Sequence, residues 1–228
     1  MTTLTVAGLA LARSASLEEM SDSSLSKTTT SWRTALAEYI RCEAKPVDKY
    51  GHQPRLYALT RQIGDGMSYD DDVVFAATWM HDLGVFVGHR PEEPVALAAW
   101  DNVVYVIDRT PEILREFGFP EEKIPAVIEA IRTHQPHKQP ESIEATILRD
   151  ADILEQLGAV GILRAVSKVG RDTRFATFSE IIPTLQKALE TLPPLIQLPS
   201  AQALAGSRIQ VLRDFLEGVE SEAGDALH

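Results

Sequence analysis

Apolar residues recur at spacings of three and four from Trp32 to the last turns of the chain, and this periodicity is the strongest constraint on its fold. Such spacing places side chains on one face of an α-helix, whereas a half-buried β-strand alternates with a period of two. Strict alternation is almost absent from the sequence. We therefore predict an all-α fold, a helical bundle with no substantial sheet.

Capping and turn residues divide this pattern into ten predicted helices. Asp70–Asp72 suit a helix start, where carboxylates meet unpaired N–H groups. Thr110-Pro111 combines a capping residue with proline at a first helical position, which predicts a new helix there. The predicted ranges are 32–44, 51–66, 70–83, 92–109, 111–117, 121–135, 141–156, 157–168, 178–191 and 200–222.

The N-terminal segment differs in composition from the remainder of the chain. Residues 14–31 are rich in Ser and Thr and poor in large apolar groups, and we predict that residues 1–31 form a flexible leader. Residues 32–228 are predicted to form a single domain that includes a C-terminal packing helix. Apolar periodicity does not distinguish packing of this helix within the chain from packing across a homodimer.

Charge and cysteine content narrow the class of protein. The chain has 22 Lys and Arg against 33 Asp and Glu, a formal charge of −11, which argues against nucleic-acid and anionic-membrane partners. The single cysteine, Cys42, excludes an internal disulfide framework and fits a reducing compartment. Leu4–Ala12 is apolar, but no basic residue precedes it, so it makes a poor signal peptide. We expect a cytoplasmic protein.

Few histidines are available for chemistry. Of the six, His228 is terminal and His89 lies in a Gly-His-Arg-Pro turn, so both are predicted to be exposed. His81 and Asp82 stand together at the end of an apolar helix, where burial is costly unless each group has a strong partner. A divalent cation would be such a partner. The alternative is a core histidine that is hydrogen-bonded to the backbone.

Two further polar residues interrupt apolar runs in the same way. His52 begins a helix with an apolar face, and Asp150 lies within the run Ile147–Leu154. Two imidazoles and two carboxylates from three helices would form a mixed nitrogen and oxygen site, which suits Mn, Fe, Co, Ni or Zn.

The order of these segments resembles a known family. HQPRL at 52–56, WMHDLG at 79–84 and ILRDADILEQLGAVGI at 147–162 together resemble the H…HD…D signature of the HD-domain superfamily of metal-dependent phosphohydrolases. The likeness is closest to small stand-alone bacterial hydrolases and covers residues 48–220. It implies a helical bundle with a divalent metal (Mn, Fe, Co, Ni, Zn or Mg) between helices, bound by His52, His81, Asp82 and Asp150.

Asp152 follows the last of these ligands by two residues, which is about 200° around a helix. We therefore expect its side chain to point elsewhere, as a supporting or capping acid. His134 matches a family histidine near the metal, which implies a further ligand or an acid for the leaving group. The alternative for His134 is a loop histidine that caps the preceding helix. Glu92 stands in a loosely matching loop, where it could act as a general base or position water.

An acidic protein that binds a phosphate needs local positive charge. Arg55, one turn from His52, and Lys138 are the candidates; the alternatives are an ion pair with a nearby acid and a solubilising surface charge.

The resemblance implies hydrolysis of a small phosphomonoester, a nucleotide among the candidates, by a metal-activated water that Asp82 orients. Other branches of the superfamily give two alternatives, a zinc hydratase of small nitriles and a di-iron oxygenase, which needs additional histidines. A non-catalytic scaffold is the third.

Overall fold

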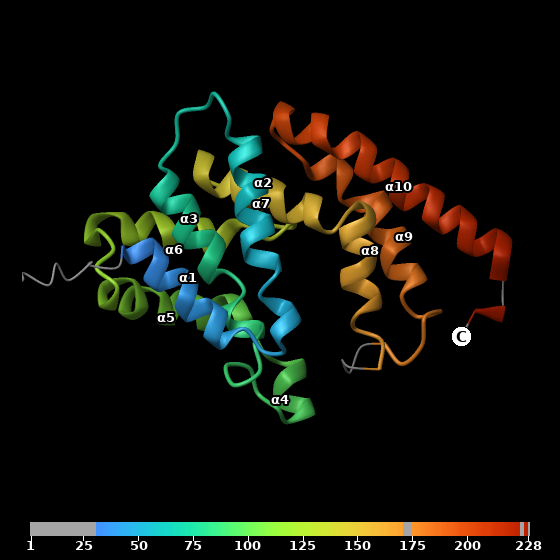
Figure 1. Cartoon of the computed structure of the whole chain (residues 1–228), viewed down its shortest axis with the longest axis horizontal. Helices are drawn as coiled ribbons and strands as arrows, with labels where there is room; N and C mark the ends of the chain where they lie inside the picture. The colour runs from blue at the N-terminus through green and yellow to red at the C-terminus, as the bar shows by residue number, and fades with distance from the viewer. Residues whose placement is uncertain (1–30, 171–174, 224–225, 228) are drawn as a thin grey trace, which may run out of the picture. The chain divides into compact units, whose positions relative to one another are not determined.

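The computed structural model describes residues 31–170, 175–223 and 226–227, and within these ranges the chain is helical (Figure 1). No strand occurs in the described residues, which contain one isolated bridge between Val87 and Arg90. The predicted all-α fold is therefore confirmed. The α-helices are α1 (Trp32–Glu43), α2 (His52–Ile63), α3 (Asp71–Met80), α4 (Pro94–Ala98), α5 (Asn102–Glu116), α6 (Ile124–Thr133), α7 (Ile143–Glu155), α8 (Gly158–Val166), α9 (Ile182–Thr191) and α10 (Pro199–Ala223).

Short 3₁₀ helices lie in several connections: η1 (Val47–Lys49), η2 (Leu83–Val85), η3 (Glu121–Lys123) and η4 (Pro193–Leu195). The predicted leader falls almost entirely on residues 1–30, which lie outside the described ranges. Its last residue, Ser31, caps α1, because its side chain accepts a hydrogen bond from the backbone N–H of Thr34.

The predicted boundaries around α5 are wrong in two places. The range 92–109 is divided, because the Asp101 carboxylate accepts the N–H groups of Val103 and Val104 and so starts a separate helix. Pro111 lies inside α5 and does not begin a new helix. The buried face of α5 continues past Pro111 to Ile113, so tertiary packing outweighs the cost of about 3 kcal/mol for an interior proline.

Helix α3 is the centre of the described bundle. It packs against α1, α2, α6 and α7, and every residue from Val73 to Met80 is buried. A helix that is apolar on all sides is stable only when other helices surround it. The C-terminal end of α3, where His81 and Asp82 follow, therefore lies deep among helices from distant parts of the sequence.

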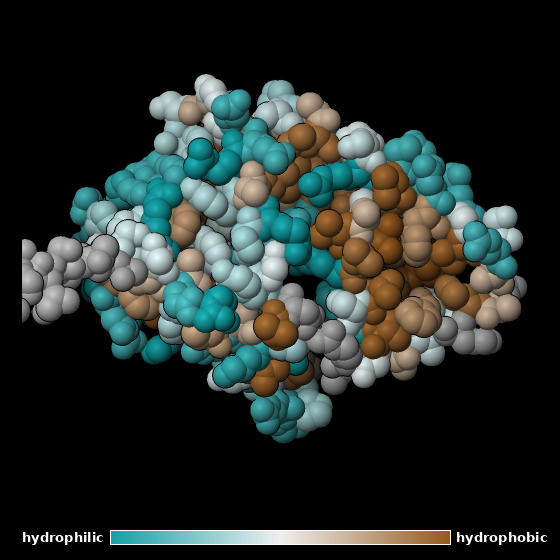
Figure 2. All heavy atoms as spheres, in the orientation of Figure 1, coloured by the Kyte–Doolittle hydropathy of each residue, from teal (hydrophilic) through white to brown (hydrophobic). Residues whose placement is uncertain are grey.

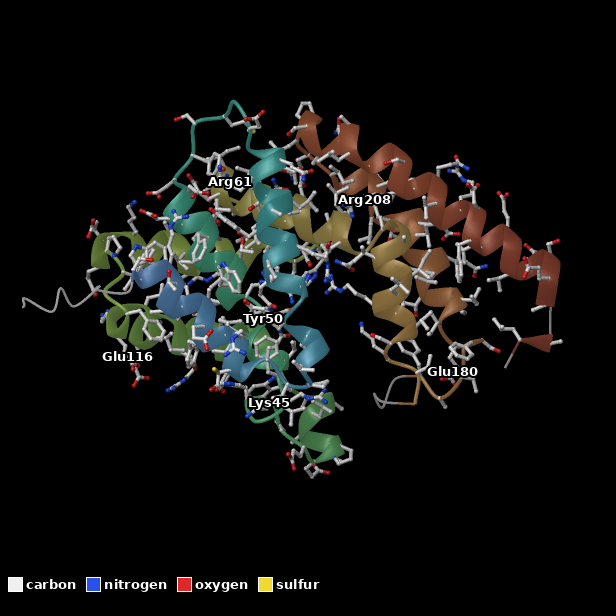
Figure 3. The ribbon with its side chains drawn as sticks, in the orientation of Figure 1. Lys45, Tyr50, Arg61, Glu116, Glu180 and Arg208 are labelled. Atoms are coloured by element: carbon white, nitrogen blue, oxygen red, sulfur yellow. The ribbon has the colours of Figure 1, made fainter. Side chains whose placement is uncertain are left out.

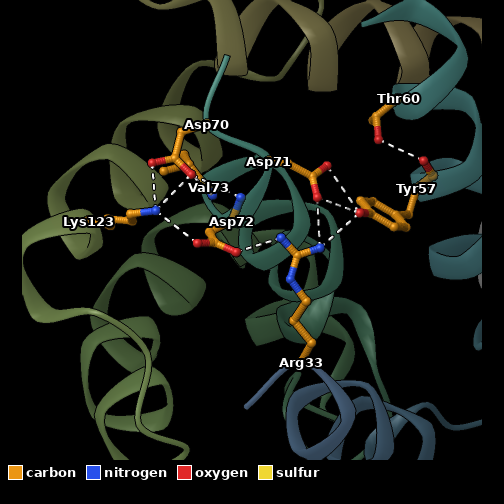
Figure 4. A network of polar contacts seen from close by, with 8 residues as sticks. All are labelled: Arg33, Tyr57, Thr60, Asp70, Asp71, Asp72, Val73 and Lys123. Carbon is orange, nitrogen blue, oxygen red and sulfur yellow. Dashed lines mark hydrogen bonds and ion pairs between the residues drawn. The ribbon is translucent and has the colours of Figure 1, made fainter. Parts of the chain in front are cut away.

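The N-terminal end of α3 is fixed by charge (Figure 4). Asp70 caps the helix by accepting the N–H groups of Asp72 and Val73. Lys123 contacts Asp70 at 2.9 Å and Asp72 at 2.8 Å, and Arg33 from α1 pairs with Asp72. The predicted cap is thus also the point where α1, α3 and η3 are held together.

Helix α10 packs against α7, α8 and α9. Arg208 reaches from α10 and donates to the carbonyl oxygen of Leu154 at 2.9 Å (Figure 3).

Apolar side chains gather over α8, α9 and α10 on the face seen in Figure 2. Leu163 and Phe178 are 68% and 46% exposed. No helix among the described residues is long and apolar enough to cross a membrane.

Candidate metal centre

His81 follows the last residue of the buried helix α3 and is 1% exposed. Its Nδ1 lies 2.8 Å from the carbonyl oxygen of Thr78, one turn earlier. A carbonyl only accepts, so we assign the ring proton to Nδ1. The other nitrogen, Nε2, therefore carries a free lone pair.

His52 is the first residue of α2 and is 5% exposed. Its Nδ1 lies 3.2 Å from Oε2 of Glu155 on α7, and this carboxylate is 3% exposed. Because an ionised carboxylate only accepts, Nδ1 of His52 also bears the proton. A carboxylate on the outer nitrogen fixes the ring orientation of a metal-binding histidine in the same way.

The two free lone pairs face each other. Nε2 of His52 lies 3.3 Å from Nε2 of His81, and neither nitrogen has a proton to share with the other. Oδ2 of Asp82 lies 3.6 Å from both nitrogens, and Oδ1 of Asp152 lies 3.5 Å from Nε2 of His52. Two lone pairs and two carboxylates at this spacing require a positive charge among them, and the donor set suits a transition metal or zinc.

The prediction about the two aspartates of α7 is corrected by this geometry. Asp152, and not Asp150, forms a group with His52 and His81 whose ligand atoms lie within 4.8 Å of one another. Asp150 is fully buried on another face of α7, where it accepts the backbone N–H groups of Gln197 at 3.0 Å and Leu198 at 2.7 Å. The two side chains point in different directions around α7, as predicted, but the one that faces the histidines is Asp152 and not Asp150.

His134 lies at the end of α6 and is 5% exposed. Its ring centre is 5.2 Å from that of His81, so it belongs to the wall of the site. Its Nδ1 donates to the carbonyl oxygen of Ile131 at 2.6 Å, which also caps the last turn of α6. Both interpretations of this residue, the capping histidine and the neighbour of the metal site, therefore describe its position.

The protonation states match those of metal ligands. Burial lowers the pKa of His52 despite its hydrogen bond to Glu155. Burial and the adjacent His81 lower the pKa of His134. Burial opposes ionisation of Asp82, but the imidazoles of His81 and His52, while they are protonated, and the guanidinium of Arg164 outweigh it and hold the pKa of Asp82 well below the usual range. Neutral imidazoles and ionised carboxylates are the forms that bind a metal ion.

Two predicted site residues, Glu92 and Lys138, are exposed and make no recognised contact with the cluster among the described residues. Glu92 is exposed in the loop before α4, and the adjacent Glu93 caps that helix. Lys138 is exposed in the turn after α6, where its backbone N–H donates to Gln135 at 2.9 Å. No hydrogen bond or ion pair joins Glu92 or Lys138 to the cluster in the part of the chain that the structure describes.

The sequence reasoning missed two residues beside the cluster, Glu155 and Arg164. Arg55 was expected near His52, and the ion-pair alternative is the one observed, with Glu155 at 3.2 Å. Arg164, on α8, lies 3.5 Å from the same oxygen of Glu155. Glu155 lies three residues after Asp152, on the same side of a helix, and this spacing was the available signal.

His89 also corrects an expectation. It was predicted to be exposed, but its side chain is 11% exposed. Its two ring nitrogens lie 2.8 Å from Glu43 and 2.8 Å from the hydroxyl of Tyr105. The turn that carries it folds back onto α1 and α5, because these two polar partners lie there.

Comparisons with known proteins show similarity in sequence and in fold. Residues 50–157 match the family model described as HD domain. The crystal structure of Bacillus subtilis YpgQ in complex with ADP is 23% identical, with a TM-score of 0.61 over 86% of this chain and 96% of that one. An HD-superfamily hydrolase from Bacillus thuringiensis is 19% identical, with a TM-score of 0.59 over 82% and 93%.

The Lin1889 protein from Listeria innocua is 17% identical, with a TM-score of 0.59 over 83% of this chain and 93% of that one. No curated protein matches the chain. At these identities the solved structures show a shared fold, which extends beyond residues 50–157 to most of the described helices.

Proposed function

From the premise that residues 50–157 form an HD domain, we propose that the protein is a metal-dependent hydrolase of a small phosphomonoester. The observation that carries this proposal is the pair of Nε2 atoms, 3.3 Å apart, with the carboxylates of Asp82 and Asp152 beside them. We propose His52, His81, Asp82 and Asp152 as the metal ligands, and Glu155 as the acid that orients His52.

A metal ion bound here would lower the pKa of a water molecule and neutralise charge on phosphoryl oxygens. The protein side chains would then position the reactants. Asp82 is 24% exposed, more than His52, His81 or Asp152, so we assign to it the hydrogen bond that orients the attacking water. In the overall reaction the water oxygen bonds to phosphorus, the ester P–O bond breaks, and the leaving alcohol takes a proton.

His134 has a narrower role than the sequence allowed. Because its Nδ1–H donates to Ile131 and its pKa is lowered, its free Nε2 is an acceptor at neutral pH. An acceptor can bind a metal or take a hydrogen bond from water, but it has no proton for a leaving group. We therefore assign His134 to water or metal, and not to the general acid.

The competing chemistries have less support in the geometry. A di-iron oxygenase needs further histidine ligands, and both ring nitrogens of His89, one of the few candidates, are engaged by Glu43 and Tyr105. A scaffold without catalysis would leave unexplained why two buried imidazoles present lone pairs to each other.

The test is to remove divalent metals with a chelator, restore them singly, and measure phosphate release from nucleotides and sugar phosphates. Bound metal is counted by elemental analysis. His81→Ala should lose metal and activity together, whereas His137→Ala, a matched change in the turn after α6, should keep both. Absence of phosphate release from protein with bound metal would refute the phosphatase proposal.

A further inference from the structure

One carboxylate oxygen of Glu155 is contacted by three nitrogen groups, one imidazole and two guanidinium groups. Its Oε2 lies 3.2 Å from Nδ1 of His52, 3.2 Å from Arg55 Nη2 and 3.5 Å from Arg164 Nη1. Arg55 comes from α2 and Arg164 from α8, so two separate helices bring guanidinium groups to one buried carboxylate. The arginine side chains are 43% and 31% exposed, whereas Glu155 is 3% exposed.

This arrangement leaves N–H donors of both arginines that Glu155 does not use. Two guanidinium groups share one carboxylate, and each has five N–H donors, of which the contact to Glu155 uses one. Arg33 shows the opposite balance, because its single guanidinium pairs with both Asp71 and Asp72. Arg33 is therefore a satisfied structural ion pair, whereas Arg55 and Arg164 retain donors that reach solvent beside the candidate metal site.

The position of Glu155 shows which part of a ligand these donors can reach. Glu155 contacts Nδ1 of His52, while Nε2 on the opposite side of the ring faces His81. Arg55 and Arg164 thus contact the carboxylate on the Nδ1 side of His52, whereas the candidate ligand atoms lie on its Nε2 side. A second anionic group of a substrate whose phosphoryl group is held at the cluster can bind the donors on the Nδ1 side.

We propose that Arg55 and Arg164 form a binding subsite for a second anionic group of the substrate, a phosphate or a carboxylate. The inference rests on the proposed function for the identity of the first group, the phosphoryl group at the metal ligands. Guanidinium groups bind both oxyanions through paired, charge-assisted hydrogen bonds. Arg164 then determines specificity, and its substrates carry two anionic groups.

Direct binding tests the subsite without turnover. Methylphosphonate and phosphonoacetate each carry a phosphonate that water does not cleave readily, and phosphonoacetate adds a carboxylate. Calorimetric titration of the metal-loaded protein, in buffer with excess metal ion, should show about tenfold tighter binding of phosphonoacetate, the equivalent of one charge-assisted contact. Arg164→Gln should reduce this preference to about twofold or less, with Arg55→Gln as an independent second variant.

The control is Arg109→Gln, because Arg109 also has a single carboxylate partner, Glu112, and is 45% exposed on a surface helix. It should leave the preference unchanged. Arg164→Lys retains the positive charge but lacks the planar guanidinium group. Its preference for phosphonoacetate should therefore lie between those of the wild-type protein and Arg164→Gln. Circular dichroism confirms that each variant is folded.

Kinetics distinguishes the two anions and separates this inference from the proposed function. Wild-type protein should prefer 3-phosphoglycerate over glycerol 3-phosphate, and fructose 1,6-bisphosphate over fructose 6-phosphate. We expect each preference to appear as a lower KM, and we expect Arg164→Gln to lose it. Whichever pair shows the larger preference identifies the second anion as carboxylate or phosphate. Binding that depends on Arg164 without any phosphate release would uphold the subsite and refute the hydrolase. Equal preferences in wild type and Arg164→Gln would overturn the subsite, whatever the activity.

Discussion

Asp150 and Asp152 lie two residues apart on α7, and the structure predicts opposite consequences for the same substitution at each. Asp152→Asn should remove metal binding with little effect on the metal-free fold. Asp150→Asn should leave metal binding intact and destabilise the fold. The two substitutions are matched in chemistry and lie on the same helix.

The expected magnitudes follow from the contacts of each carboxylate. Asp150 is fully buried and accepts the N–H groups of Gln197 and Leu198, and an amide in its place turns a donor toward at least one of them. Charge-assisted hydrogen bonds contribute about 1.5–3 kcal/mol each, but burial raises the pKa of Asp150 and so opposes its charge; we therefore expect a net loss of about 1–2 kcal/mol in the free energy of unfolding. Asp152 is 15% exposed, its carboxylate lies beside His52 and accepts a hydrogen bond from Gln156, and its charge acts on His134. Its loss should cost less than about 1 kcal/mol.

For metal affinity, Asp152→Asn should have the larger effect and Asp150→Asn the smaller one. Removal of a residue that only supports a ligand typically weakens binding by about 10–100-fold, and loss of a ligand atom should cost at least as much. Calorimetric titration of each metal-free variant gives the affinity, and urea unfolding in the presence of a chelator gives the stability. If Asp150→Asn loses the metal while Asp152→Asn binds it normally, the assignment of the ligand set from the geometry is refuted.

Two further predictions concern the fold around the site. Hydrogen bonding from Lys123 holds the pKa of Asp72 below its usual value despite partial burial, and Arg33 adds to this effect. The carboxylate therefore stabilises the fold above the unfolded pKa of about 3.9, and the stability is lost as pH falls through the lower folded pKa. Urea unfolding between about pH 6 and pH 3 should show Asp72→Asn less stable at the upper end and nearly equal at the lower end; a constant difference would contradict this. Gly84→Ala would place a Cβ 2.7 Å from the carbonyl oxygen of Asn102, so thermal unfolding should reveal a loss of about 1–3 kcal/mol, and an unchanged Tm would mean that α5 shifts freely.

The fold class was predictable because helical periodicity extends through the described chain, but the boundaries around α5 were not. A proline after a threonine usually marks a helix start, and the sequence gives no indication that α5 continues through Pro111. The continuation depends on α6 and η2, which pack against α5 from other parts of the chain. Local signals compete with such packing, and the packing prevails when the buried face is continuous.

The predictable part of the site consists of polar residues that interrupt apolar helices. His52, His81 and Asp82 were expected together. In the structure the two Nε2 atoms lie 3.3 Å apart, and Oδ2 of Asp82 lies 3.6 Å from each of them. Arg164 gave no such signal, because one arginine on a short helix is typical of a solvated surface. Arg164 matters to the site only because it contacts Glu155. That contact joins α8 to α7, and the angle between these helices is not encoded in the apolar periodicity.

The choice between Asp150 and Asp152 shows a further limit. Burial of an acid in an apolar run predicts a strong partner, but backbone N–H groups satisfy a carboxylate as a cation does. For Asp150 those groups come from Gln197 and Leu198, in a segment 47 and 48 residues later whose approach α7 itself does not reveal. The helix face of Asp152 carried additional evidence, because Glu155 lies three residues later on the same side of α7 and contacts Nδ1 of His52. Two acids that approach the same buried histidine identify the face of α7 that meets the candidate ligands, whereas the burial of Asp150 alone does not.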